Sequence, residues 1–239
     1  MRMSRSTSLV AALVLWSALP LRAQTALEPS GHWDGRIEAP GFEKTFTVDV
    51  AKNDTGGFAG TLSIPAEHLN GLPIRITVTG KLVHFVARED QPFNAYLSED
   101  GKSMSGDFSV EGFSIPLTMT RTGDARVDTP ERSATIGKEL EGHWIATVPV
   151  ESTSMRLVLT IANDPDGTSS GSMINLDQGK LEIPVSAITQ SASSVSLDFK
   201  AVGASFAGTL DAGATELAGT YQERGRAMPL TFRRAPENK

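Results

Sequence analysis

Gly31-His32-Trp33 returns 111 positions later as Gly142-His143-Trp144. Further along, a two-residue insertion changes the spacing to 113, and Pro116-Leu117-Thr118 returns as Pro229-Leu230-Thr231. Two constant spacings that are separated by one small shift indicate an internal duplication. The 239-residue chain therefore contains two copies of one structural unit, and each copy begins with a tryptophan.

Both copies have the periodicity of β-strands. Apolar and polar residues alternate along residues 46–50 and 74–79 in the first copy, and along 157–161 and 195–199 in the second. Such alternation is typical of strands that bury one face. Turn signals rich in Asp, Asn and Gly separate the runs. Short strands that follow one another at intervals of about 8–12 residues, with such turns between them, are expected of an all-β sandwich or barrel.

The sequence predicts an all-β protein made of two tandem antiparallel up-and-down β-barrel-like domains, with about eight strands in each. We place the first β-barrel-like repeat at residues 31–123 and the second at residues 142–236. Closure is expected because a meander removes its exposed edges when its first strand pairs with its last. Residues 124–141 contain Pro130 and many charges without an apolar period, which predicts an exposed linker.

A tryptophan and a late arginine are expected to close one end of each barrel. By alternation along their strands, Trp33 and Arg121 both point inward, and their strands are neighbours in a closed barrel. The guanidinium would then cap the indole ring through a cation–π contact worth about 0.5–2 kcal/mol. Trp144 and Arg234 are expected to repeat this structural pair in the second barrel.

Residues 1–23 have the pattern of a secretory signal peptide. Arg2 and Arg5 precede an apolar run at 9–19, and Ala23 provides a small residue at the expected cleavage site. The run is shorter than the roughly 20 apolar residues that a transmembrane helix needs, and no second such run follows, so we expect no membrane association after cleavage. Loss of three arginines changes the formal net charge from −6 to −9. We expect a periplasmic or secreted protein.

Composition excludes several classes of function. The chain has 22 Lys+Arg against 28 Asp+Glu, and nucleic-acid binders carry a basic footprint, so no nucleic-acid partner is expected. It has no Cys, which excludes disulfides, thiolate–metal sites and cysteine nucleophiles. Its four His have no short metal-ligand spacing. We therefore expect neither a metal nor another cofactor.

One stretch matches a catalytic motif by letter. Residues 167–171 read G-x-S-x-G, with Ser169 in the place of a hydrolase nucleophile. That motif needs a strand-to-helix turn and a histidine later in the chain, whereas the last histidine here is His143. Ser169 is expected to be structural, no catalytic residue is predicted, and the chain is not expected to be an enzyme.

The second copy also resembles a known kind of domain. The stretches that carry the resemblance are residues 173–179, 183–185, 206–210, 219–222 and 229–231. They are similar to a bacterial exported all-β domain often found upstream of α/β-hydrolase or β-lactamase-type serine hydrolase domains. The resemblance implies an all-β fold with no assigned catalytic residues. A weaker resemblance, confined to the Gly-x-Trp and the late arginine, links both copies to lipocalin- and avidin-like barrels.

Two functions follow from this architecture. The first is an exported non-catalytic module that binds a partner protein or assists an enzyme, and the alternative is a carrier of a small apolar ligand in a barrel interior. A filled interior would favour the first function and an open one the second. Binding is expected around Asp177, Gln178 and Gln222, where the first copy has Ala66-Glu67 and Ser109. The alternative role for these residues is to fix a turn by hydrogen bonds.

Overall fold

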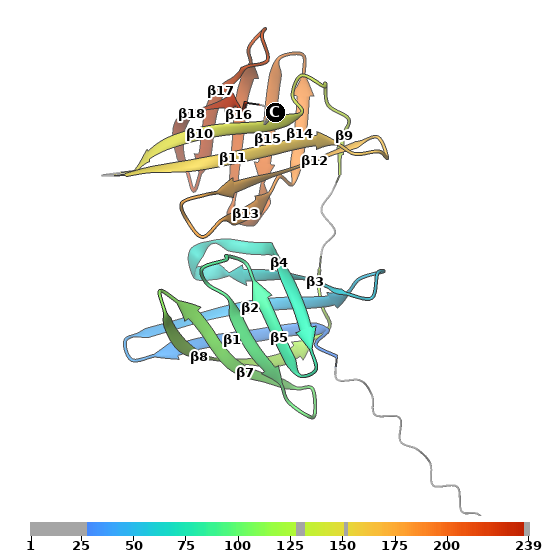
Figure 1. Cartoon of the computed structure of the whole chain (residues 1–239), viewed down its shortest axis with the longest axis vertical. Coiled ribbons are helices and arrows are strands. Elements are labelled where there is room, and N and C mark those ends of the chain that lie inside the picture. Colours follow the sequence, from blue (N-terminus) through green and yellow to red (C-terminus); the bar gives the residue numbers. More distant parts are fainter. Residues whose placement is uncertain (1–27, 128–131, 151–152, 237–239) are drawn as a thin grey trace, which may run out of the picture.

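Two antiparallel β-barrels lie one above the other along the long axis of the molecule (Figure 1). The computed structural model describes residues 28–127, 132–150 and 153–236. The signal peptide expected at 1–23 lies outside these residues. The prediction of an all-β fold with two tandem barrels is confirmed. Among the described residues, no helix is long and apolar enough to cross a membrane.

The first barrel is a closed ring in which each strand pairs with the next in the chain and the last pairs with the first. Its strands are β1 (Gly31–Ala39), β2 (Phe42–Lys52), β3 (Phe58–Ile64), β4 (Leu69–Thr79), β5 (Leu82–Val86), β6 (Phe93–Leu97), β7 (Ser103–Val110) and β8 (Phe113–Gly123). A 3₁₀ turn, η1 (Pro65–Glu67), joins β3 to β4. The alternation read from the sequence decides which face is inside, because successive side chains of β1 are buried and then more exposed.

The second barrel follows the same plan with one strand broken in two. Its strands are β10 (Gly142–Val150), β11 (Thr153–Asn163), β12 (Thr168–Asn175), β13 (Leu181–Pro184), β14 (Ala187–Ser191), β15 (Ser194–Phe199), β16 (Ala204–Leu210), β17 (Glu216–Glu223) and β18 (Arg226–Arg234). A second 3₁₀ turn, η2 (Lys200–Val202), follows β15.

Strands β13 and β14 together occupy the place of β4 in the first barrel. Val185 still donates its N–H to the carbonyl of Gly171 in β12 at 2.8 Å. The next residue, Ser186, instead directs its N–H and its hydroxyl to the carbonyl of Asp198 in β15, at 2.7 and 2.9 Å. The hydrogen bonds of the chain therefore change from β12 to β15 between Val185 and Ser186. This change divides one strand into β13 and β14 and accounts for the ninth strand.

The end of each barrel at which β1 or β10 begins is closed by the predicted arginine–tryptophan pair. Trp33 and Trp144 are both 0% exposed. The guanidinium carbon of Arg121 lies 4.7 Å from the ring centroid of Trp33, and that of Arg234 lies 4.2 Å from Trp144. The capping contact predicted for both copies is therefore present, and we call this side of each barrel its closed end.

The segment that precedes each tryptophan is held by the indole N–H. Trp33 Nε1 donates to the carbonyl of Pro29 at 2.8 Å, and Trp144 Nε1 donates to the carbonyl of Leu140 at 3.0 Å. In both copies the acceptor is four residues before the tryptophan. The duplication therefore extends a few residues before the boundaries that the sequence indicated.

The expectation that residues 124–141 form an exposed linker is wrong for their second half. Ile136 and Leu140 are buried in the core of the second barrel, at 6% and 0% exposure. A short strand, β9 (Ser133–Ala134), pairs with β12, and the hydroxyl of Ser133 accepts the N–H of Ile188 at 2.7 Å. Because these contacts lack a regular spacing, the apolar side chains produce no period in the sequence.

The two barrels differ in how completely they close. β1 pairs with β8 from His32 to Ile37, whereas β10 pairs with β18 only at Trp144 and Ile145. Beyond Ile145 a surface pocket of about 520 Å³ lies along β10 and β18. The second barrel is therefore closed at its tryptophan end and has a side opening, which we call the seam, toward its other end.

We expect Trp33→Ala and Trp144→Ala each to destabilise the barrel that contains the substitution. Truncation of a buried tryptophan costs about 3–5 kcal/mol, against a domain stability of about 5–15 kcal/mol. Hydrogen exchange measured at increasing temperature, on peptides from each barrel, should show that only the altered barrel opens at a lower temperature than in wild type. Unchanged exchange in both barrels would contradict a closing role for the tryptophans.

Candidate functional site: a cavity between the two barrel mouths

The ends opposite the tryptophans, which we call the mouths, face each other across the middle of the molecule. Strand β4 of the first barrel contacts β13 and η2 of the second, as Figure 1 also shows for β4 and β13. Between the mouths lies a cavity of about 740 Å³, lined by residues of both barrels. This volume is within the range of about 300–1,000 Å³ that is usual for small-molecule sites.

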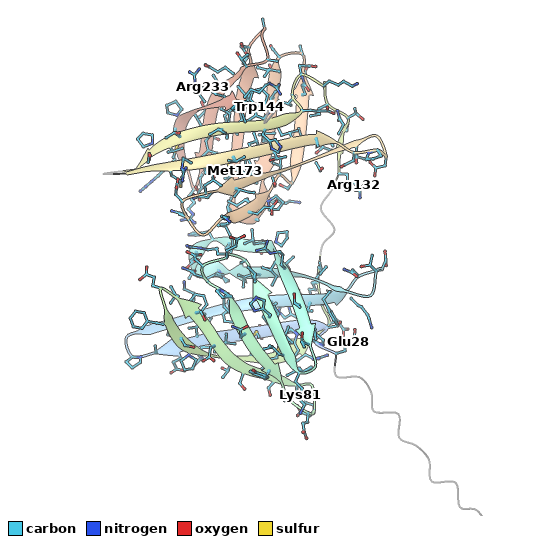
Figure 2. The ribbon with its side chains drawn as sticks, viewed as in Figure 1. Glu28, Lys81, Arg132, Trp144, Met173 and Arg233 are labelled. Carbon is cyan, nitrogen blue, oxygen red and sulfur yellow. The ribbon has the colours of Figure 1, made fainter. Side chains whose placement is uncertain are left out.

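The walls of the cavity are mostly apolar. Its buried lining residues from the first barrel are Ile37, Phe46, Leu62, Ile64, Leu72, Phe93 and Phe108. Its buried lining residues from the second barrel are Val148, Leu157, Met173, Asn175, Ile183, Tyr221 and Leu230. Met173 is labelled in Figure 2, nearer to the first barrel than Trp144 is. Water in a space with such walls is readily displaced by an apolar molecule.

The cavity is built from equivalent positions of the two copies. Leu62 and Met173 are 111 positions apart, as are Leu72 and Ile183, and each pair lines the cavity. The two mouths therefore meet in an approximately symmetric way, as two copies of one surface do in a two-fold dimer. The duplication thus accounts for the cavity as well as for the two barrels.

The deeper interior of the first barrel is filled. Beyond the mouth of the first barrel, the remaining space among Val48, Ile74, Phe85 and Met119 has a volume of only about 10 Å³. The aromatic rings of Phe46 and Phe93 pack at 5.5 Å between centroids. The open space therefore lies between the two barrels, where each barrel contributes its mouth.

Polar contacts hold one side of the junction. Glu89 donates its backbone N–H to the carbonyl of Gly179 at 3.0 Å, and its carboxylate accepts the ammonium group of Lys180 at 2.8 Å. The hydrogen bond from Lys180 lowers the pKa of Glu89 below its ordinary value. Gly179 has φ +59°, a conformation that favours glycine, and a Cβ here would lie 1.8 Å from the carboxylate of Asp90 and would force that side chain to shift.

A second contact crosses the junction. The guanidinium of Arg224 in the second barrel donates to the backbone carbonyl of Glu67 in η1 at 2.6 Å. Both residues line the cavity. The rim is therefore built from side chains that also join the two barrels, so that binding and domain arrangement depend on the same residues.

Two buried polar residues interrupt the apolar walls. Asn175 is 7% exposed and Tyr221 is 9% exposed. Burial, followed by the nearby charge of Glu223, raises the pKa of the Tyr221 hydroxyl above its ordinary value. The hydroxyl is therefore a neutral hydrogen-bond donor throughout the physiological pH range.

The structure separates the three residues predicted to bind. Gln178 lines the cavity, and its Oε1 accepts the amide N–H of Asn175 at 3.0 Å. Asp177 instead accepts the backbone N–H of Arg156 at 2.7 Å and its guanidinium at 2.6 Å, which lowers the pKa of Asp177. These bonds tie Asp177 to the neighbouring strand β11. Gln222 lies on the outer face of β17 and is exposed, whereas Tyr221 points inward.

The motif serine is also placed by the structure. Ser169 is 2% exposed, and its hydroxyl donates to the carbonyl of Ala134 in β9 at 2.8 Å. This hydrogen bond gives the serine a structural role, because it anchors the segment that precedes the second barrel. Within the described ranges, no group of three or more His, Asp or Glu residues is arranged to hold a metal ion.

The seam reaches the same cavity from the side. Val148 of β10 and Leu230 of β18 line both the cavity and the surface pocket at the seam. In the first barrel the equivalent residues, Ile37 and Leu117, pair directly. In the second barrel, the side chains of Val148 and Leu230 therefore stand between the cavity and the surface pocket. In the first barrel, paired strands close the wall at this point.

Tyr221 provides a direct test of these walls, because the chain has only two tyrosines. In a Tyr96→Phe variant, phenolate absorbance should stay absent through the ordinary tyrosine pKa of about 10 and should appear together with loss of ellipticity. The folded state holds the phenol proton more tightly than the unfolded state, so stability should fall as pH rises above about 10. A reversible midpoint near 10 in a folded protein would contradict the buried position of Tyr221.

No family model matches the chain, and no curated protein matches it. Similar solved structures include a candidate outer membrane protein from Bacteroides fragilis, with 14% identity, 88% of this chain and 99% of that chain covered, and a TM-score of 0.26. A protein of unknown function from the DUF3598 family of Nostoc punctiforme has 15% identity, 88% and 99% coverage and a TM-score of 0.27. MucB, solved in complex with MucA(peri), has 10% identity, 89% and 90% coverage and a TM-score of 0.21.

Proposed function

We propose that this chain is an exported, non-catalytic protein that binds one small apolar molecule in the cavity between its two barrel mouths. The observation that supports this proposal is the cavity itself, with about 740 Å³ of space and apolar side chains from both barrels on its walls. Transfer of apolar surface from water into such a space is favourable by roughly 25 cal/mol per Å². No reactive group has to be supplied for this function.

A filled barrel interior favours a partner-binding module, and an open one favours a ligand carrier. The first barrel is filled near its tryptophan, and open space lies between the two mouths, which favours the carrier over a module that binds partner proteins through its surface. Partner binding and the resemblance to hydrolase-associated domains stay predictions. The proposed periplasmic or secreted location is supported by the signal-peptide pattern at residues 1–23.

Binding of the neutral fluorophore N-phenyl-1-naphthylamine tests the proposal. Wild-type protein should increase its fluorescence in a saturable manner, with one molecule bound per chain. Ala66 and Ala87 are small residues that line the cavity, so Ala66→Trp and Ala87→Trp together should occupy part of it. We expect the double variant to bind at least about tenfold more weakly, which corresponds to about 1.4 kcal/mol.

The matched control is Thr118→Trp, which adds the same side chain at an exposed position of β8 that does not line the cavity. Its affinity should remain within a factor of about two of wild type, since it leaves the cavity unchanged. Equal affinities of the fluorophore for wild type, the double variant and the control would place its binding elsewhere and overturn the proposal.

A further inference from the structure

The two halves of the cavity differ in polarity, and the internal repeat shows where. Every buried residue with which the first barrel lines the cavity is apolar. At the positions equivalent to Ile64 and Phe108, the second barrel instead carries Asn175 and Tyr221. Because the two copies otherwise share their apolar lining, these two replacements are a specific feature of the second mouth.

Asn175 and Tyr221 face the cavity from opposite walls. Asn175 ends β12 and Tyr221 lies in β17, and three strands (β11, β10 and β18) separate them along the shorter path around the barrel. A group that lies between these walls meets an amide on one side and a phenol on the other. An apolar molecule gains nothing from these groups, whereas a polar group at this place can bond to both.

The present partners of the two side chains leave room for a ligand. The Asn175 amide oxygen accepts the backbone N–H of Asp177 at 3.1 Å, and the amide nitrogen donates to Gln178 Oε1 at 3.0 Å. The same nitrogen also donates to the sulfur of Met155 at 2.9 Å, and a thioether is a weak acceptor. A hydroxyl or carbonyl oxygen in the cavity would be a better acceptor for that N–H. The Tyr221 hydroxyl lies near the carboxylate of Glu223 at the rim, whose charge adds to burial in raising the pKa of the phenol. Its oxygen can still accept a hydrogen bond from a ligand hydroxyl or amide.

Charges at the rim argue for a neutral ligand. Each lysine or arginine that lines the cavity is already paired with a carboxylate. Lys44 pairs with Glu67, Arg88 pairs with Asp90 at 2.8 Å, and Arg224 lies 3.7 Å from Glu223. An anionic head group would have to displace one of these carboxylates or face it. A neutral head group meets neither cost.

On the basis of the proposed function, we infer that the ligand is a neutral amphiphile. Its apolar chain lies against the all-apolar half formed by the first barrel, and its hydroxyl, ester or amide group lies between Asn175 and Tyr221. This arrangement places the polar group where the second mouth has polar side chains. It also leaves the paired charges of the rim undisturbed.

Substitution of the second mouth by the residues of the first gives a matched test. Asn175→Ile with Tyr221→Phe installs the residues found at the equivalent positions 64 and 108. Displacement of N-phenyl-1-naphthylamine by 1-dodecanol and by dodecanoate is measured for wild type and for this variant. We expect wild type to prefer the alcohol, and the double variant to lose about tenfold in affinity for the alcohol, as two lost hydrogen bonds imply. The affinity for the fluorophore is measured for each protein, and we expect the ratio of alcohol affinity to fluorophore affinity to fall about tenfold in the double variant, since only the alcohol needs the two hydrogen bonds.

A second control and a second variant make the outcomes decisive. Gln222→Ser installs the residue at equivalent position 109 on the outer face, and it should leave all three affinities unchanged. If Asn175→Ile disrupts the turn at Asp177, Tyr221→Phe alone should still lower the affinity for the alcohol about threefold. Equal binding of the alcohol by wild type and the folded variants, or a wild-type preference for dodecanoate, would overturn the inference while the carrier function stands. Absence of any fluorophore binding would overturn both.

Discussion

The contact between an arginine and a tryptophan at the closed end is the interaction on which each barrel depends. An eight-stranded barrel has an interior just wide enough to be filled by side chains, and Trp33 and Trp144 fill it at one end. Arg234 also ties distant segments together, because its guanidinium donates to the carbonyls of Ala214, Glu141 and Glu139. Arg121 reaches the carbonyl of Glu28 in the same way. The cap therefore joins the last strand to the chain that enters the first.

Closure of one end determines what the other end can do. With the tryptophan end filled, unfilled space can only lie at the mouth, and a single mouth would expose apolar side chains to water. The duplication removes this cost because the second mouth covers the first. The covered space is the cavity, and its symmetric origin explains why Leu62 and Met173 line it together. The buried lining of the two copies differs in polarity at two positions, where the second copy has Asn175 and Tyr221 and the first has Ile64 and Phe108.

The sequence predicts features that follow from local periodicity and parity, and it misses those that arise from packing between segments. The strands, the duplication and both caps follow from alternation along the chain. The burial of Ile136 and Leu140 was missed because irregular contacts leave no period. The cavity was missed because no local pattern records how two barrels meet. A comparison of the copies residue by residue would have singled out Asn175 and Tyr221, whereas Asp177 attracted attention although its carboxylate is bound to Arg156 of the neighbouring strand.

The meeting of the two mouths is tested most directly by zero-length cross-linking with a carbodiimide, followed by peptide mass spectrometry. The carboxylate of Glu89 and the ammonium group of Lys180 lie 2.8 Å apart across the junction, and Glu99 and Lys81 lie 3.1 Å apart within the first barrel. If the mouths face each other in solution, an amide bond should join Glu89 to Lys180 within one chain, alongside the Glu99–Lys81 link. Formation of the Glu99–Lys81 link without the Glu89–Lys180 link would contradict the shared cavity.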